Sequence, residues 1–150
     1  MNLYIMLHQD HEKTKSLFEQ LQAAGEYEES LRERLFSALL REMELHAEAE
    51  ERFFYSRLKN NDTTRDWVSA SLAEHKIMKK TLHELNAADK GTPDWTVKCA
   101  RLREMAEDHI ADEEEKLFPL AQYVIEEEEA AGIAEDIESF KEEHSEMELL

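Results

Sequence analysis

Apolar residues recur along most of the chain at intervals of three and four positions, the spacing that gathers them on one face of an α-helix. The pattern is interrupted at four places: near Gly25, at residues 60–62, near Gly91 and near Gly132. It therefore predicts five helices, over about residues 3–24, 30–58, 64–88, 94–123 and 133–149. Pro119 lies late in the fourth of them, where it is expected to bend or end the helix.

The composition agrees with a helical chain. Only three glycines and two prolines occur in 150 residues, while Glu, Leu, Ala, Lys and Met are abundant, as is typical of helices. A chain of this length forms one domain with a core of its own. The sequence thus predicts an all-α protein with a single domain over residues 1–150, in which a four-helix core covers about 3–123 and an extra C-terminal helix about 133–149.

The net charge is −18, from 36 acidic and 18 basic residues. Because nucleic acids and anionic membrane surfaces are themselves negative, this charge argues against binding to either. The N-terminus starts apolar but turns polar within eight residues, which is too short for a signal-peptide core or a membrane span. The single cysteine, Cys99, excludes a disulfide framework and a cysteine-based metal site. We therefore expect a cytoplasmic protein without nucleic-acid or membrane partners.

The chain also repeats itself at an offset of about 64 residues. The segment HAEAEERFFYSRL, from His46, resembles HIADEEEKLFPLA, from His109, and an acidic residue precedes both His11 and His75. The two histidines of the first half are 35 residues apart, and those of the second half are 34 apart. Two matching helical hairpins are a natural way to build an up-down-up-down four-helix bundle with approximate two-fold symmetry.

The four histidines stand at matching depths in the predicted helices. Measured to the nearer edge of the predicted turns that join the four helices, at residues 25–30, 60–62 and 91–93, each histidine lies 13 to 16 residues away. Because a helix rises about 1.5 Å per residue, their positions along a bundle differ by only a few ångströms. Glu50 and Glu113 follow His46 and His109 by four residues and share their helix faces. The spacing predicts one polar layer, made of His11, His46, Glu50, His75, His109 and Glu113.

A buried layer of this kind is the ligand set of a non-haem di-metal site. A buried carboxylate without a partner is costly, and a metal ion would satisfy carboxylates and imidazoles together. Imidazole suits iron, zinc, copper or nickel, carboxylates can bridge two ions, and two irons would use this combination best. Glu50 and Glu113 would be the bridges. One ion would take His11, with His46 as a candidate second ligand, and the other His75 and His109. Positions left open on the two ions would admit a small ligand.

The remaining polar candidates are given other roles. His8 is interpreted as a surface or outer-shell residue, His83 falls outside the repeat, and His144 fits the packing stripe of the tail helix. Asp10 and Glu74 are predicted to face outward, with a hydrogen bond to a neighbouring imidazole as the alternative.

Two other kinds of bundle are alternatives to this interpretation. A ferritin-like oxidase needs Glu-x-x-His pairs, and no glutamate stands three positions before His46, His75 or His109. A purely structural bundle with scattered histidines predicts no metal.

Four segments together resemble the hemerythrin-like (HHE cation-binding) family: DHEKTKSLF, HAEAEE, EHKIMKKTL and HIADEEEKLFP. The resemblance covers the four helices, about residues 3–123. It implies a hemerythrin-like four-helix bundle with two non-haem iron ions, oxo- or hydroxo-bridged, that bind dioxygen or nitric oxide. The ligand positions of the family fall on His11, His46, Glu50, His75, His109 and Glu113.

The sequence departs from the marine-invertebrate oxygen carriers of this family in its third helix. Those proteins have a second histidine four residues further on, where this chain has Lys79. Their fourth-helix carboxylate also comes five residues after the histidine, so Glu114 stands as the alternative to Glu113. The set of four histidines and two carboxylates is more similar to bacterial di-iron proteins linked to nitric-oxide handling and iron–sulfur repair.

Three functions follow as hypotheses. The first is a di-iron protein that binds dioxygen or nitric oxide for sensing, storage or scavenging. The second is a di-iron enzyme that reduces nitric oxide or peroxide, or supplies iron for iron–sulfur cluster repair, and Lys79 favours it over a stable oxygen carrier. The third is an interaction module in which the tail helix and the acidic surface contact a partner.

Overall fold

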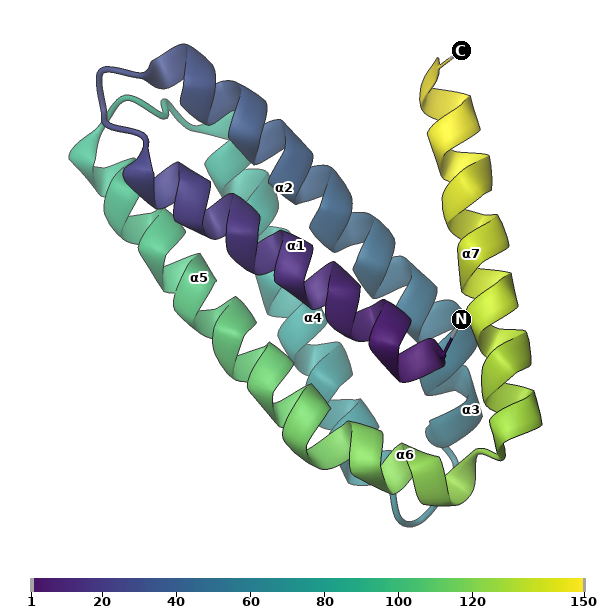
Figure 1. Cartoon of the computed structure of the whole chain (residues 1–150). Coiled ribbons are helices and arrows are strands. Elements are labelled where there is room, and N and C mark those ends of the chain that lie inside the picture. Colours follow the sequence, from purple (N-terminus) through teal and green to yellow (C-terminus); the bar gives the residue numbers. More distant parts are fainter. Residues whose placement is uncertain (1, 150) are drawn as a thin grey trace.

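The computed structural model describes residues 2–149, and the side chains of residues 2–145. Over this range the chain forms helices joined by short turns and contains no strand. The four helices of the core, called rods here because two of them are made of several helical elements in line, run antiparallel as a bundle (Figure 1). The C-terminal helix packs against one end of this bundle (Figure 1). The predicted fold, an all-α four-helix bundle with an extra C-terminal helix, is confirmed.

Two of the rods contain a short π-helical segment, in which backbone hydrogen bonds span five residues instead of four. The elements in chain order are α1 (Leu3–Ala23), α2 (Glu29–Ala49), η1 (Glu50–Tyr55), α3 (Ser56–Leu58), α4 (Arg65–Ala87), α5 (Pro93–Asp112), η2 (Glu113–Leu117), α6 (Phe118–Val124) and α7 (Glu127–Leu149). The second rod is α2 continued by η1 and α3, and the fourth is α5 continued by η2 and α6. None of the helices over residues 2–149 combines the length and the apolar character needed to cross a lipid bilayer.

Local signals in the sequence explain where two of the rods begin. The side chain of Asn2 accepts hydrogen bonds from two backbone N–H groups of the first turn and so caps α1. Thr92 caps α5 by accepting from the N–H of Trp95 at 3.2 Å, and Pro93 follows at a position where a missing N–H has no cost. These caps place the starts of the rods that carry the first and last histidines of the repeat.

The sequence pattern did not predict the π-helical segments. Pro119, which was expected to bend or end the fourth helix, is the second residue of α6, which follows η2 directly, and the rod continues to Val124. Proline is tolerated there because the wide turn before it has already shifted the backbone hydrogen-bond pattern.

The predicted start of the C-terminal helix was wrong. The helix begins at Glu127 rather than near residue 133, and Gly132 lies inside it. A Cβ at Gly132 would meet no atom within 4 Å, and its φ is not positive, so nothing in the backbone ends the helix there. The longer helix packs Ala130 against the bundle and places three glutamates, residues 127–129, in its first turn, where the helix dipole favours negative charge.

The buried apolar residues form two clusters, one towards each end of the bundle. The first joins the start of α1 to η1, α6 and α7, and it includes Leu7, Phe54 and Ile137. The second joins the later part of α1 to α2, α4 and α5, and it includes Phe36 and Leu85. All five of these side chains are fully buried. The histidines lie in a layer between the two clusters. The clusters exclude water from this layer along the bundle axis.

Candidate metal centre

All six predicted residues converge in this layer. They come from every rod of the bundle: His11 from α1, His46 from α2, Glu50 from η1, His75 from α4, His109 from α5 and Glu113 from η2. Their side-chain nitrogen and oxygen atoms form two groups, in each of which the atoms lie within 4.8 Å of one another. One group is His11, His46, Glu50 and Glu113, and the other is Glu50, His75, His109 and Glu113.

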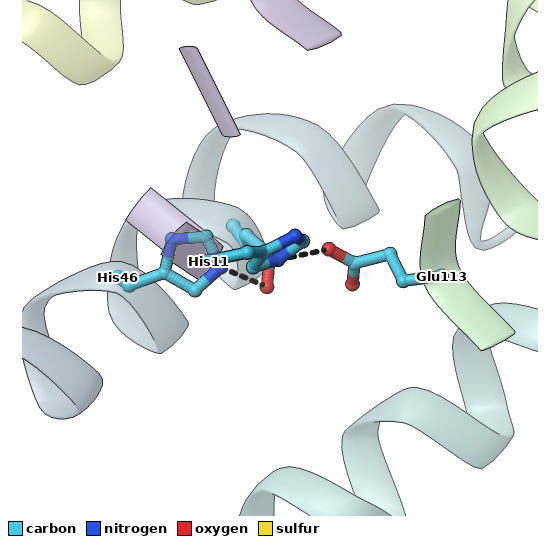
Figure 2. Close-up of side chains that lie close together, drawn as sticks. His11, His46 and Glu113 are labelled. Atoms are coloured by element: carbon cyan, nitrogen blue, oxygen red, sulfur yellow. Dashed lines mark ion pairs between the residues drawn. The ribbon is translucent and has the colours of Figure 1, made fainter. Parts of the chain in front are cut away.

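Both carboxylates therefore belong to both groups, as bridging ligands would. Glu50 and Glu113 are 0% and 1% exposed. Figure 2 shows the first group: the rings of His11 and His46 lie close together, and the carboxylate of Glu113 points toward His11. His11 Nε2 is 3.2 Å from Glu113 Oε1, and His46 Nε2 is 3.0 Å from Glu50 Oε1. In the second group, the Nε2 atoms of His75 and His109 are 3.1 Å apart.

Each of the four imidazoles forms a hydrogen bond to a carboxylate through its Nδ1 atom, on the side that faces away from the centre of the layer. The pairs are His11 with Glu114 at 2.5 Å, His46 with Asp10 at 2.8 Å, His75 with Glu51 at 2.8 Å and His109 with Glu74 at 2.7 Å. A carboxylate can only accept, so Nδ1 carries a proton and donates the hydrogen bond, and Nε2 faces the centre of the layer, where its lone pair can bind a metal once the ring is neutral. This is the arrangement that orients histidines toward a metal ion.

Several buried polar atoms in the layer make no hydrogen bond. They are His11 Nε2, His46 Nε2, Glu50 Oε2 and Glu113 Oε1, all within the first group. The contacts of 3.0 and 3.2 Å described above are close in distance but do not have hydrogen-bond geometry. A buried polar atom left unpaired costs about 1–3 kcal/mol. A cation at the centre would accept electron pairs from all four atoms, so these residues fit a bound metal.

Burial and charge oppose each other within the layer. Burial, and then the charge of Glu50, raise the pKa of Glu113. Burial also disfavours a charged Glu50, but His46 and the hydrogen bonds around it outweigh this and lower the pKa of Glu50 well below its usual range. Burial disfavours a protonated His75, but bonds to Glu50 and Glu51 outweigh it and raise the pKa of His75 to about 9. Without a metal the layer therefore holds protons at neutral pH, and a metal would displace them.

Tyr55 is a site residue that the sequence reasoning missed. It is buried, and its ring stacks on His75 with centroids 5.4 Å apart. Its O–H donates a hydrogen bond to Glu113 Oε2 and lies 3.3 Å from Glu50 Oε1. The repeat held a signal for it: Tyr55 comes five residues after Glu50, across η1, and Phe118 comes five residues after Glu113, across η2.

At this aromatic position the two halves of the layer thus differ by one hydroxyl group. Phe118 stacks on His11, with centroids 6.1 Å apart and ring planes at 12°, just as Tyr55 stacks on His75. A buried tyrosine hydroxyl usually has a hydrogen-bond partner, and for Tyr55 the partners are the two shared carboxylates. The sequence alone distinguishes the two residues, but only the structure shows what the hydroxyl contacts.

A cavity of about 630 Å³ leads to the layer from the side of α2 and α4. It reaches all four histidines, and much of its lining is apolar: Met43, Leu72, Met78, Leu82, Ala106 and Ile110. Lys79, at the position where the oxygen carriers have a further histidine, is exposed and also lines this cavity. The arrangement offers a small, uncharged molecule a route to the side of the layer at which Nε2 atoms converge.

The sequence matches the model of one protein family, the hemerythrin HHE cation-binding domain, over residues 2–121. The chain belongs to this family. The fold of this hemerythrin-domain chain is similar to a solved HHE cation-binding domain-containing protein from Mycobacterium kansasii, with a TM-score of 0.79 and 23% identity. The match covers 95% of this chain and 89% of the other.

A protein of Nostoc sp. (strain PCC 7120), described as a DNA nickase, is also similar. It is 27% identical to this hemerythrin-domain chain over 118 residues, which are 79% of the chain. The chain spans about a third (33%) of the length of that relative.

The structure also places the polar residues that surround this hemerythrin-type layer. Glu114 lies outside it and bonds to Nδ1 of His11, and the exposed His8 bonds to Glu114 at 2.9 Å. His83 pairs with Glu44 on the surface, and His144 lies on α7 against Phe140. Asp10 and Glu74 do not simply face outward, because each bonds to an imidazole of the next rod.

Proposed function

We propose that this protein binds two non-haem iron ions through His11, His46, Glu50, His75, His109 and Glu113, and binds dioxygen or nitric oxide reversibly for sensing, storage or scavenging. The observation that carries the proposal is the pair of ligand groups that share Glu50 and Glu113. Two carboxylates common to two sets of histidines suit a pair of ions held close together, bridged by oxygen atoms. Imidazole and carboxylate together favour iron among the metals that such sites hold.

The surrounding residues prepare the site for a diatomic ligand. The outer carboxylates fix the imidazoles, the two apolar clusters exclude water along the bundle, and the apolar cavity admits a small uncharged molecule from the side. When bound, two irons would supply open coordination positions and reversible electron transfer. The Tyr55 O–H donates a hydrogen bond to the shared Glu113 carboxylate and lies close to that of Glu50, within the layer.

A second candidate function is enzymatic: reduction of nitric oxide or peroxide, or donation of iron for iron–sulfur cluster repair. Tyr55 favours it, because its phenol places a hydrogen-bond donor on the shared carboxylates, where charge that develops during a reduction could be stabilised. Lys79, in place of a further histidine, favours it as well.

We propose no nucleic-acid partner for this chain. The Nostoc relative is described as a DNA nickase, but this chain matches only 33% of that protein. A net charge of −18 repels a phosphate backbone. Fluorescence anisotropy with a labelled duplex at low salt tests this, and saturable binding would overturn it. A cytoplasmic location remains our expectation from the sequence.

Metal analysis after anaerobic loading with ferrous iron tests the primary proposal. We expect two irons per chain in the wild type and in His83→Ala, which changes a surface histidine, and a clear loss in His75→Ala. Fewer than about one iron per wild-type chain would overturn the site. Visible absorption then separates the two functions: a reversible band on adding dioxygen supports carriage, whereas consumption of nitric oxide or peroxide over many turnovers supports catalysis.

A further inference from the structure

We propose that Lys141, on the helix outside the bundle, is a positioning residue for the metal ion held by His11 and His46. Lys141 donates a hydrogen bond to Asp10 Oδ2, and the same oxygen accepts from His46 Nδ1 at 2.8 Å. The opposite nitrogen of that ring, His46 Nε2, is buried and makes no hydrogen bond. A continuous chain of polar contacts thus links α7 to a ligand atom. The inference rests on the proposed metal binding.

This link exists in only one half of the repeat. Among the side chains of residues 2–145, Asp10 pairs with Lys141, and no lysine or arginine pairs with the other outer carboxylates, those of Glu51, Glu74 and Glu114. Those three are 43%, 40% and 24% exposed, whereas the Asp10 side chain is 7% exposed. Water can solvate an exposed carboxylate, but a buried one needs a cation beside it. Lys141 supplies that cation.

The packing of α7 holds Lys141 in place. Ile137 and Phe140, four residues and one residue before it on the helix, are 0% and 4% exposed. The ring of Phe140 lies 5.6 Å from that of Phe53, and the Arg52 guanidinium lies 5.4 Å from the Phe140 centroid. Arg52 and Phe53 belong to η1, the segment that begins with Glu50. The turn that presents a shared carboxylate is therefore also the docking surface for α7.

Two consequences follow for a loaded protein. Only the ion on the His11 and His46 side is linked to Lys141, through Asp10, so we expect the Lys141 contact to affect how firmly that ion is held and not the ion on the His75 and His109 side. The coupling is also reciprocal: if docked α7 strengthens metal binding, bound metal must strengthen the docking of α7 by the same factor.

The test measures loss of iron from the fully loaded chain to a ferrous chelator under anaerobic conditions. In Lys141→Met, which keeps the length of the side chain, we expect one of the two irons to leave about 10-fold faster, the lower end of the effect of outer-shell changes. Lys141→Arg should stay near the wild type. Lys13→Met is the matched control, because Lys13 is an exposed lysine on α1 that lines the same 580 Å³ cavity as Lys141.

A double-mutant cycle and a second readout separate positioning from general damage. Asp10→Asn should release the same single iron, and adding Lys141→Met to it should have no further effect, because the link is already broken. Iron loading should slow amide hydrogen exchange over residues 137–145 in the wild type but not in Lys141→Met.

The outcomes that would refute the Lys141 inference differ from the outcome that would refute iron binding itself. Unchanged iron release in a folded Lys141→Met, equal acceleration of both irons, or additive effects of the two substitutions would refute the inference. A wild-type chain that retains no iron would refute the proposed function itself. Far-UV circular dichroism checks folding, and Asp10→Asn carries the test if Lys141→Met does not fold.

Discussion

Replacing Tyr55 by phenylalanine removes one oxygen atom from the middle of the polar layer and leaves the ring in place. The Tyr55 side chain is 1% exposed, and its hydroxyl donates to Glu113, with Glu50 as a second neighbour. A hydrogen bond to a charged acceptor contributes about 1.5–3 kcal/mol. The cavity that reaches the histidines is not lined by Tyr55, Glu50 or Glu113, so we do not expect water to replace the lost donor. We therefore expect Tyr55→Phe to lower the free energy of unfolding of the metal-free chain by about 2 kcal/mol.

Urea denaturation of the metal-free chain, followed by circular dichroism, measures this change. For a chain of this size, 2 kcal/mol corresponds to a fall in Tm of roughly 4–8 °C. The penalty should shrink when the chain is loaded with iron, because a metal on Glu113 would replace the interaction that the phenol made with it.

Tyr4→Phe is the matched control. The ring of Tyr4 packs against Phe54 and Phe118 in the same cluster, with centroids 6.0 and 5.3 Å apart. Its buried hydroxyl makes no hydrogen bond within the described structure, and burial raises its pKa to about 12. Removing that hydroxyl should be neutral or slightly stabilising. If Tyr55→Phe costs less than about 0.5 kcal/mol, as a surface change would, or no more than Tyr4→Phe, the reasoning about the layer is refuted.

Three other predictions concern the ligands, the thiol and the tail helix. Glu113→Ala should lose most of the bound iron, whereas Glu114→Gln, which changes a residue that bonds to His11 Nδ1 and His8 outside the layer, should weaken binding by about 10–100-fold; full retention of both irons in Glu113→Ala would remove Glu113 from the ligand set. Burial raises the pKa of the Cys99 thiol to about 11 from an ordinary value of 9.0, so iodoacetamide should modify the folded chain about 100-fold more slowly than the urea-unfolded chain, as mass spectrometry would show. Gly132→Ala should raise the free energy of unfolding by about 0.5–1 kcal/mol, because an added methyl group meets nothing and alanine favours helix; a destabilised variant would contradict the helix drawn through Gly132.

The sequence by itself determined the fold class and the composition of the polar layer. Apolar spacing fixes which face of each helix is buried, and the constant rise of a helix turns residue number into depth. The matching depths of His11, His46, His75 and His109 therefore predicted that they would meet, and in the structure they do. Glu50 and Glu113 followed from the same argument, since four residues make about one turn. The family resemblance pointed to the same six residues, and the family is confirmed.

Only the tertiary structure decided which side chain lies opposite which. The π-helical turns at η1 and η2 shift the register after each glutamate, and periodicity of 3.6 residues cannot anticipate such a shift. Through η1 Tyr55 reaches the shared carboxylates, and only the structure shows that Glu114 bonds to His11 Nδ1 from outside the layer.

The contact between Asp10 and Lys141 could not be predicted from the sequence, for a different reason. The two residues are 131 positions apart, and they meet because α7 starts earlier than its pattern indicates and packs on η1. Helix periodicity describes each rod alone. How a helix outside the bundle lies against the others is set by side-chain packing between elements, and that packing exists only in the folded protein.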